Sequence, residues 1–253
     1  MLSSEPLWEQ YKHQLEALTT AELNFDLDKR EEFTEAAGWH LDEYEVELPS
    51  EPPGAPVAGG SWEAGQQVMR EYRFADPTLI TGIYYPDTPL AERVMLLRAS
   101  FLMFTFYFGV RVGSVTDEVR ETEEGPAQVW GFNYQTLKGH FEKGQMDFEI
   151  WKYLGSGRVF FRIHAFSRPD KIPNPFYRLG FKLFGRRLQR HFARQALKRM
   201  KRFVREEVAE RELGVPAPEP EEGPSVQPAS ATAESAEQME EAQEQAAEEP
   251  PSN

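Results

Sequence analysis

Alternation of apolar and polar residues through residues 106–166 constrains the fold of this chain more than any other feature. Successive side chains of a strand point to opposite faces, so this period of two predicts strands. Short links between them imply an antiparallel sheet, and the glycine-containing link at 154–157 is typical of a hairpin. The predicted strands cover residues 106–113, 115–121, 127–137, 145–153 and 158–166.

The sheet needs a cover over one face, and the segment beyond Pro175 can provide it. Residues 176–205 hold 11 Arg or Lys and no acid. We predict that Gly185 divides this segment into a short piece and a long helix. The apolar half of the long helix would close the sheet through Leu188, Phe192, Ala193, Ala196, Leu197, Met200, Phe203 and Val204. The other half would form a cationic surface of Arg187, Arg190, Arg194, Lys198, Lys201 and Arg205.

Two further elements are predicted before the sheet. Residues 67–74 alternate and predict a strand that opens the domain. Asp87-Thr88-Pro89 supplies a capping residue and a proline suited to the first helical turn. It predicts a helix that runs through Leu90, Val94, Leu97 and Phe101.

Charge divides the chain into three parts. Residues 1–65 carry 15 acids and 3 bases, residues 66–213 carry 17 acids and 25 bases, and residues 214–253 carry 10 Glu and no base. The net charge of −14 therefore hides a basic centre between acidic ends. We predict an acidic N-terminal arm at 1–65, a central domain at 66–210 and a disordered acidic tail at 211–253, which has too few apolar residues to fold.

The arm is interpreted as an appendage that contains one helix and a Pro/Gly linker. Apolar residues at helical spacing predict the helix, namely Leu7, Tyr11, Leu15 and Leu18. Prolines and glycines at 49–60 indicate the linker. Its aromatic residues could pack on the domain or on a partner: Trp8, Phe25, Phe33, Trp39 and Tyr44.

Several classes of protein are excluded. The chain has no cysteine, which rules out disulfides, thiolate nucleophiles and thiolate metal sites. The most apolar run, 94–110, is interrupted by Arg98 and is too short to span a membrane. The first residues lack the pattern of a secretory signal, so we expect a cytoplasmic protein.

A glycine-bounded polar motif interrupts the predicted sheet: GFNYQTLKGHFEKG at 131–144, followed by HAFSRP at 164–169. With the Arg-rich helix after it, this motif resembles the domain-of-unknown-function family nineteen-ninety over about residues 70–202. The resemblance implies an α+β fold similar to the helix-grip of the START and birch-pollen-allergen superfamily. In that fold a curved antiparallel sheet grips a long C-terminal helix around a cavity. The family has no assigned chemistry.

Six residues of the motif are candidates for binding a ligand: Tyr134, Thr136, His140, Glu142, His164 and Arg168. His140, Glu142 and His164 could in principle ligate zinc or iron, but isolated histidines usually serve as hydrogen-bond partners, so we expect no metal and no cofactor. His140 or His164 could instead act as an acid or base oriented by Glu142 or Asp147. A structural alternative is that the glycines and Glu142 only shape a turn.

Our leading hypothesis is binding of a hydrophobic or amphipathic small molecule in a cavity between the sheet and the C-terminal helix. The alternatives are an enzyme that acts on such a ligand through His140 and Glu142, or an adaptor that uses the acidic arms and the basic helix. The cationic surface has no aromatic residues for base stacking, so we expect no specific nucleic acid. A weak contact with an anionic surface, or screening of the helix by the acidic tail, fits its charge. The oligomeric state is left open.

Overall fold

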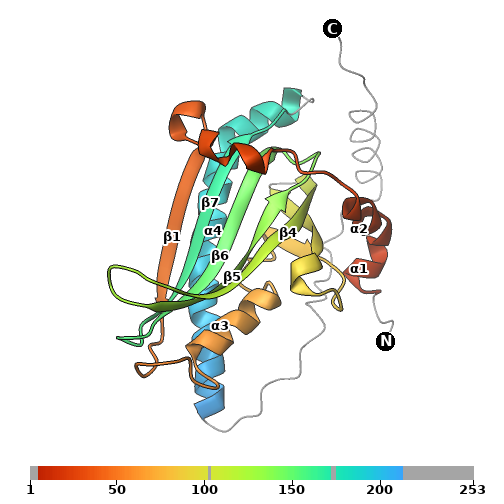
Figure 1. Cartoon of the computed structure of the whole chain (residues 1–253). Coiled ribbons are helices and arrows are strands. Elements are labelled where there is room, and N and C mark those ends of the chain that lie inside the picture. Colours follow the sequence, from red (N-terminus) through yellow and green to blue (C-terminus); the bar gives the residue numbers. More distant parts are fainter. Residues whose placement is uncertain (1–4, 102–103, 172–174, 213–253) are drawn as a thin grey trace.

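A seven-stranded antiparallel sheet forms the centre of the molecule, with the strand order β1-β7-β6-β5-β4-β3-β2 (Figure 1). The computed structural model describes residues 5–101, 104–171 and 175–212, with residues 101, 104, 175–184 and 212 described by their backbone alone. The strands are β1 (His40–Leu48), β2 (Ile80–Ile83), β3 (Val94–Phe101), β4 (Phe104–Arg120), β5 (Ala127–Thr136), β6 (Glu142–Tyr153) and β7 (Val159–Pro169). The predicted antiparallel sheet is confirmed.

The long helix α4 (Pro175–Glu212) lies along one face of this sheet, which we call the inner face (Figure 1). The opposite face is the outer face. Five of the residues predicted on the apolar half of α4 are buried in the main core: Phe192, Ala193, Ala196, Met200 and Val204. The predicted α+β fold with a long C-terminal helix is therefore confirmed. A break at Gly185 is wrong, because α4 runs through it, and one glycine costs a helix only about 1 kcal/mol.

A second helix, α3 (Ser61–Arg70), packs against α4 and β6 on the inner face. The strand predicted at 67–74 is therefore wrong. Trp62, Gly65, Val68 and Met69 are buried and recur at helical spacing, so the apolar pattern that matters starts before residue 67. A Cβ on Gly65 would lie 2.8 Å from Ile150 Cδ1, so glycine lets α3 approach the sheet closely.

The helix predicted through residues 90–101 is also wrong. Only the 3-10 turn η3 (Leu90–Glu92) forms at its start, and β3 follows. Met95, Leu96 and Leu97 are all buried, because Leu96 packs under the N-terminal helices while its neighbours face the inner core. A strand buried on both faces loses its alternation and cannot be told from a helix by periodicity.

The strands predicted at 106–113 and 115–121 are one strand, β4. A β-bulge between Val112 and Ser114 joins the two halves and shifts the register with β5. A Cβ on Gly113 would lie 2.3 Å from Gln135 Nε2, so the side chain of Gln135 packs directly against the bulge. Gly113, which separates the two predicted strands, therefore lies at a bulge within a single strand.

The N-terminal arm belongs partly to the sheet, so its interpretation as an appendage is wrong for β1. This strand pairs with β7 at the edge of the sheet. Its Tyr44 and Val46 pack on the core while Glu45 and Glu47 pair with Arg162 and Arg158. The exposed acids of β1 thus form one face of an amphipathic strand. The alternation of exposed and partly buried residues in this segment is the sequence signal for a strand that the prediction missed.

The part of the arm before β1 packs on the outer side of the sheet. The predicted helix is confirmed as α1 (Leu7–Gln10) and α2 (Lys12–Thr19), with α2 against β3. Short 3-10 helices η1 (Leu27–Glu32) and η2 (Glu35–Ala37) lead to β1. Phe25, Phe33 and Trp39 surround Phe166, so these aromatic residues pack on the domain. Most of the predicted acidic tail, from residue 213 on, lies outside the described residues.

The segment at 49–60 is held against the sheet by a buried ion pair. Glu51 Oε2 lies 2.6 Å from Lys152 Nζ, and both side chains are almost fully buried. The Glu51 carboxylate also accepts hydrogen bonds from the backbone N–H groups of Val57 and Trp62. The predicted linker therefore has a fixed position and anchors the start of α3.

Candidate functional site

The polar motif is divided between the two faces of the sheet. Phe148 pairs with Ile163, and both belong to the inner core. Their neighbours Asp147 and His164 pair with each other and therefore point to the outer face. By the same alternation Tyr134, Thr136 and Glu142 lie on the inner side, toward α4. The six candidate residues thus do not form one site.

Glu142 is the ionisable group at the inner end of the motif. Its carboxylate accepts a hydrogen bond from Gln189 Nε2 of α4. Arg186, one turn earlier in α4, donates to Asp42 of β1, with Nη2 2.6 Å from Oδ1. Burial raises the pKa of Glu142 to about 7, although Arg186 and the Gln189 hydrogen bond act in the opposite direction. This carboxyl group can therefore hold or release a proton near neutral pH.

His140 contacts Glu142 through the backbone. Its Nδ1 accepts a hydrogen bond of 2.9 Å from the N–H of Glu142, which places the ring proton on Nε2. The ring lies 4.6 Å from that of Phe108. Burial lowers the pKa of His140 to about 4, so the ring is neutral at physiological pH. This arrangement is that of a turn, in which Gly139 takes a φ of 92°.

Tyr134 and Thr136 have different surroundings. The Tyr134 hydroxyl donates to Met146 Sδ at 3.5 Å, and burial raises its pKa. It lies beside the buried hydroxyl of Tyr72, a residue with the left-handed φ of 58°. Thr136 Oγ1 donates to Asn24 Oδ1 at 2.6 Å and accepts from the N–H of Gly144 at 2.9 Å. Thr136 therefore fastens the N-terminal arm to the sheet.

The outer face carries a chain of hydrogen bonds that crosses three strands. Gln135 Nε2 donates to Gln145 Oε1 at 2.9 Å, and Gln145 Nε2 donates to Asp147 Oδ1 at 2.8 Å. Asp147 Oδ2 lies 3.3 Å from His164 Nδ1, and this contact raises the pKa of His164. Sequence reasoning missed Gln135 and Gln145 as members of this network. Arg168 also follows the outer face, and its side chain is exposed.

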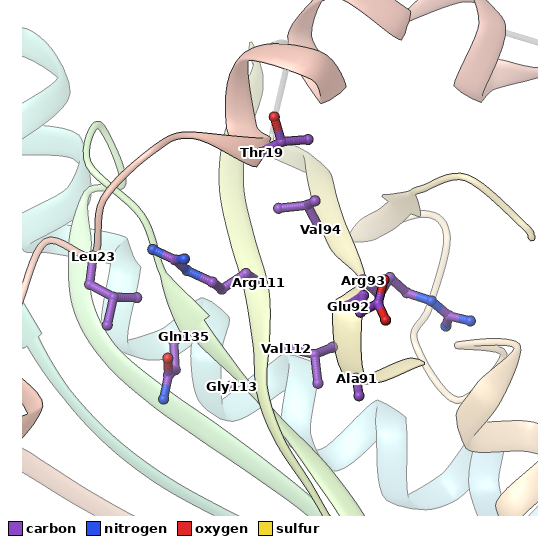
Figure 2. Close-up of a pocket in the computed structure, with 10 residues that line it drawn as sticks. All are labelled: Thr19, Leu23, Ala91, Glu92, Arg93, Val94, Arg111, Val112, Gly113 and Gln135. Atoms are coloured by element: carbon purple, nitrogen blue, oxygen red, sulfur yellow. The ribbon is translucent and has the colours of Figure 1, made fainter. Parts of the chain in front are cut away.

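A pocket of about 520 Å³ opens on the outer side, beside the end of α2 (Figure 2). Arg111 of β4 lines it and donates to the Ala21 carbonyl at 2.9 Å, and Gln135 connects it to the polar network. The other lining residues are Thr19, Leu23, Ala91, Glu92, Arg93, Val94, Val112 and Gly113. This pocket was not predicted, because it depends on how the arm packs over the β-bulge.

The described residues contain neither a candidate metal cluster nor a candidate membrane-spanning helix. No group of three or more His, Asp or Glu side chains within 5–101, 104–171 and 175–212 lies close enough together to hold a metal ion. In the same part of the chain no helix is long and apolar enough to cross a membrane.

The sequence matches a known family over most of the described fold. Residues 27–199 match the family model described as Domain of unknown function (DUF1990). The chain belongs to this family. The DUF1990 match starts before β1 and ends within α4, so it includes the edge strand that the arm contributes. No curated protein matches the chain.

Solved structures with similar folds share little sequence with this DUF1990 protein. Ara h 8.0201 is 11% identical, over 67% of this chain and 99% of that chain, with a TM-score of 0.39. A point mutant of norcoclaurine synthase from Thalictrum flavum, in complex with a transition-state analogue, is 10% identical over 69% and 96%, with a TM-score of 0.41. TTHA0849 from Thermus thermophilus is 8% identical over 66% and 98%, also with a TM-score of 0.41. Because these TM-scores are below 0.5, the fold assignment rests on the strand order and on α4.

Proposed function

We propose that this DUF1990 protein binds an amphipathic small molecule on the inner face of the sheet, between the sheet and α4. The observation that carries the proposal is Glu142, a carboxyl group with a pKa of about 7 at the end of a largely apolar inner face. A ligand with one polar group and an apolar body matches this distribution.

The apolar part of the proposed site consists of residues that remain partly exposed although they face α4. Phe108 and Met146 pack against the main core without being buried in it, and Tyr44 and Val46 of β1 do the same. When a ligand covers apolar side chains of the inner face, the free energy falls by about 25 cal/mol for each Å² of apolar surface removed from water. They supply the hydrophobic contact surface for the ligand.

The polar part is built from three elements. Glu142 of β6 and Gln189 of α4 are hydrogen-bonded to each other, and the Arg186–Asp42 pair adjoins them. Below pH 7 the Glu142 carboxyl can donate a hydrogen bond to a ligand, and above pH 7 it can pair with a cationic group. Tyr134 lies on the same side, whereas His164 and Arg168 on the outer side are not part of this proposal.

Substitution of Met146→Trp should block the site. A larger side chain at this partly exposed inner position takes the place of the ligand, and we expect at least about a tenfold loss of affinity, or about 1.4 kcal/mol. The probe is the amphipathic dye 1-anilinonaphthalene-8-sulfonate, titrated against the full chain by fluorescence.

Val119→Trp is the matched control, because it adds the same side chain at a position that is 55% exposed, near the end of β4. Its affinity should equal that of the unchanged protein. Circular dichroism and thermal melting check that both variants are folded. Equal affinities of folded Met146→Trp and Val119→Trp would contradict the proposal, as would the lack of any dye binding by the unchanged protein.

Glu142 should also make stability depend on pH. Its pKa rises from an ordinary 4.5 to about 7 on folding, so the folded state retains a proton in this window that the unfolded state has lost. Stability conferred by this group is therefore full below pH 4.5 and lost as the pH rises through 7. We expect Glu142→Gln to remove about 1–3 kcal/mol of this pH-dependent change, at about 1.4 kcal/mol per pKa unit.

The measurement is urea unfolding at pH 5 and pH 8, and the comparison between variants is essential. Folding lowers the pKa of His140 to about 4, so the stability that this residue confers rises with pH between 4 and 6.5. In the unchanged protein this rise partly cancels the fall in stability that Glu142 causes. Exposed Glu31→Gln is the control and should leave the slope unaltered. An identical pH dependence in Glu142→Gln and Glu31→Gln would show that Glu142 titrates normally.

A further inference from the structure

The solvent side of α4 is a continuous line of positive charge. We define the cationic ridge as six exposed residues of this helix: Arg187, Arg190, Arg194, Lys198, Arg202 and Arg205. At 100° per residue they fall on one face of the helix, and they extend over 18 residues, or about 27 Å. Five of the six residues predicted for the cationic surface of α4 belong to this ridge, whereas the predicted Lys201 is only partly exposed and Arg202 takes its place.

The ridge has almost no counter-charges in the described part of the chain. Among the described residues, Arg202 is the one member of the ridge that has a carboxylate neighbour, Glu206, at 3.8 Å. Both side chains of this pair are more than half exposed. Other arginines of α4 do have partners, since Arg186 pairs with Asp42 and Arg211 with Glu207. Cations three or four residues apart on a helix repel one another, so the ridge favours an anionic partner.

The same chain carries a suitable partner directly after α4. Residues 214–253 contain 10 Glu and no Lys or Arg. Seven of these glutamates lie between residues 234 and 249. The two adjoining segments carry opposite charges, and Glu206 is the one carboxylate of the described residues that pairs with the ridge, so the charges point to contact within one molecule.

The tail is long enough to reach the ridge. The middle of the ridge lies about 16 residues before the end of α4 at Glu212, or about 24 Å along the helix. Glu234 lies 22 residues beyond Glu212, and five prolines lie between them. A proline-containing linker reaches farther than the roughly 23–28 Å of a Gly/Ser-rich chain of this length, so it can span this distance. Because the tail is tethered to α4, its effective concentration at the ridge is high.

We propose that the glutamates at 234–249 bind the cationic ridge of α4 within the same chain. The contact is electrostatic, so it weakens as salt screens the charges. It makes the tail a tethered competitor for any other polyanion that reaches α4. The inner-face site does not take part, so this inference is independent of the proposed ligand.

The absence of cysteine allows a direct test in the full chain. A single Ser235→Cys substitution accepts one spin label, and the broadening of backbone amide signals by that label reports which residues it approaches. In about 10 mM salt, where the Debye length is about 30 Å, we expect broadening along residues 187–205. In about 1 M salt, where that length is about 3 Å, the signals should recover.

Two variants control for the tether itself. Replacement of all ten tail glutamates by glutamine keeps the chain length, and the combination Arg187→Gln, Arg194→Gln, Lys198→Gln and Arg205→Gln removes most of the ridge charge. Each should abolish the broadening at low salt. Broadening that persists in either variant, or that is missing from the unchanged chain at low salt, overturns the proposal. A further control mixes an unlabelled, isotope-enriched copy of the chain with a spin-labelled copy. Broadening of the amide signals of the unlabelled copy also overturns the proposal, because the contact would then join two molecules.

Discussion

Substitution of Lys152→Met is expected to lower the free energy of unfolding by about 3–5 kcal/mol. Removal of one partner from a buried ion pair leaves the other charge without compensation in a medium of low polarity. Lys152 is fully buried, lies 2.6 Å from Glu51 and also donates to the Ala55 carbonyl at 2.9 Å. Urea unfolding of the variant and the unchanged protein measures the effect.

The double variant Glu51→Gln with Lys152→Met tests the reason for this loss. The glutamine amide has one acceptor oxygen, which can keep the hydrogen bond from the Trp62 N–H but not also the one from the Val57 N–H, while neither charge is left buried. It should therefore be more stable than Lys152→Met alone. The exposed pair of Arg158 and Glu47 is the control, and Arg158→Gln should cost far less stability than Lys152→Met, because water already screens this pair. Equal losses from Lys152→Met and Arg158→Gln would contradict the burial argument.

Gly144→Ala is expected to cost about 3 kcal/mol or more. A Cβ at this position would lie 2.0 Å from the Phe166 carbonyl oxygen, a contact that the backbone of β7 must move to relieve. The φ of 149° adds strain of about 1–3 kcal/mol for a residue with a side chain, beyond overpacking of about 1–3 kcal/mol. Thermal and urea unfolding measure the loss.

Gly155→Ala in the next hairpin is the matched control, since a Cβ there would meet no atom within 4 Å and its φ is not in the left-handed region. Its stability should change by less than about 0.5 kcal/mol. If Gly144→Ala were as stable as Gly155→Ala, the tight approach of β6 and β7 at this glycine would be disproved. The glycine of the motif would then need a different explanation.

The parts of the fold that could be predicted are those whose two faces differ in residue type. Apolar and polar residues alternate in β5, β6 and β7 although β5 is buried on both faces, and α4 separates its apolar residues from its arginines, so these periods are visible in the sequence. The failures have the opposite cause. Strand β3 is buried on both sides and has no period, and α3 presents only a short apolar stripe that a strand pattern imitates.

The candidate site was only partly predictable, because the side of a sheet on which a residue lies depends on tertiary packing. Tyr134 and His164 both belong to the motif, and the alternation within each strand was visible. The pairing of Asp147 with His164, and the position of α4 on the other side, were not. Strand register depends on contacts between residues far apart in the sequence, which a single sequence does not encode locally.

Strand β1 has a consequence for the order of folding. Strands β2 to β7 each pair with the next strand along the chain, whereas β1 pairs with β7, so that His40 meets Ser167. During synthesis the acidic segment 40–48 must wait for more than 100 further residues before it finds its partner. Until then the charged face of β1 protects the waiting strand from pairing with other chains. The first strand made is therefore the last to join.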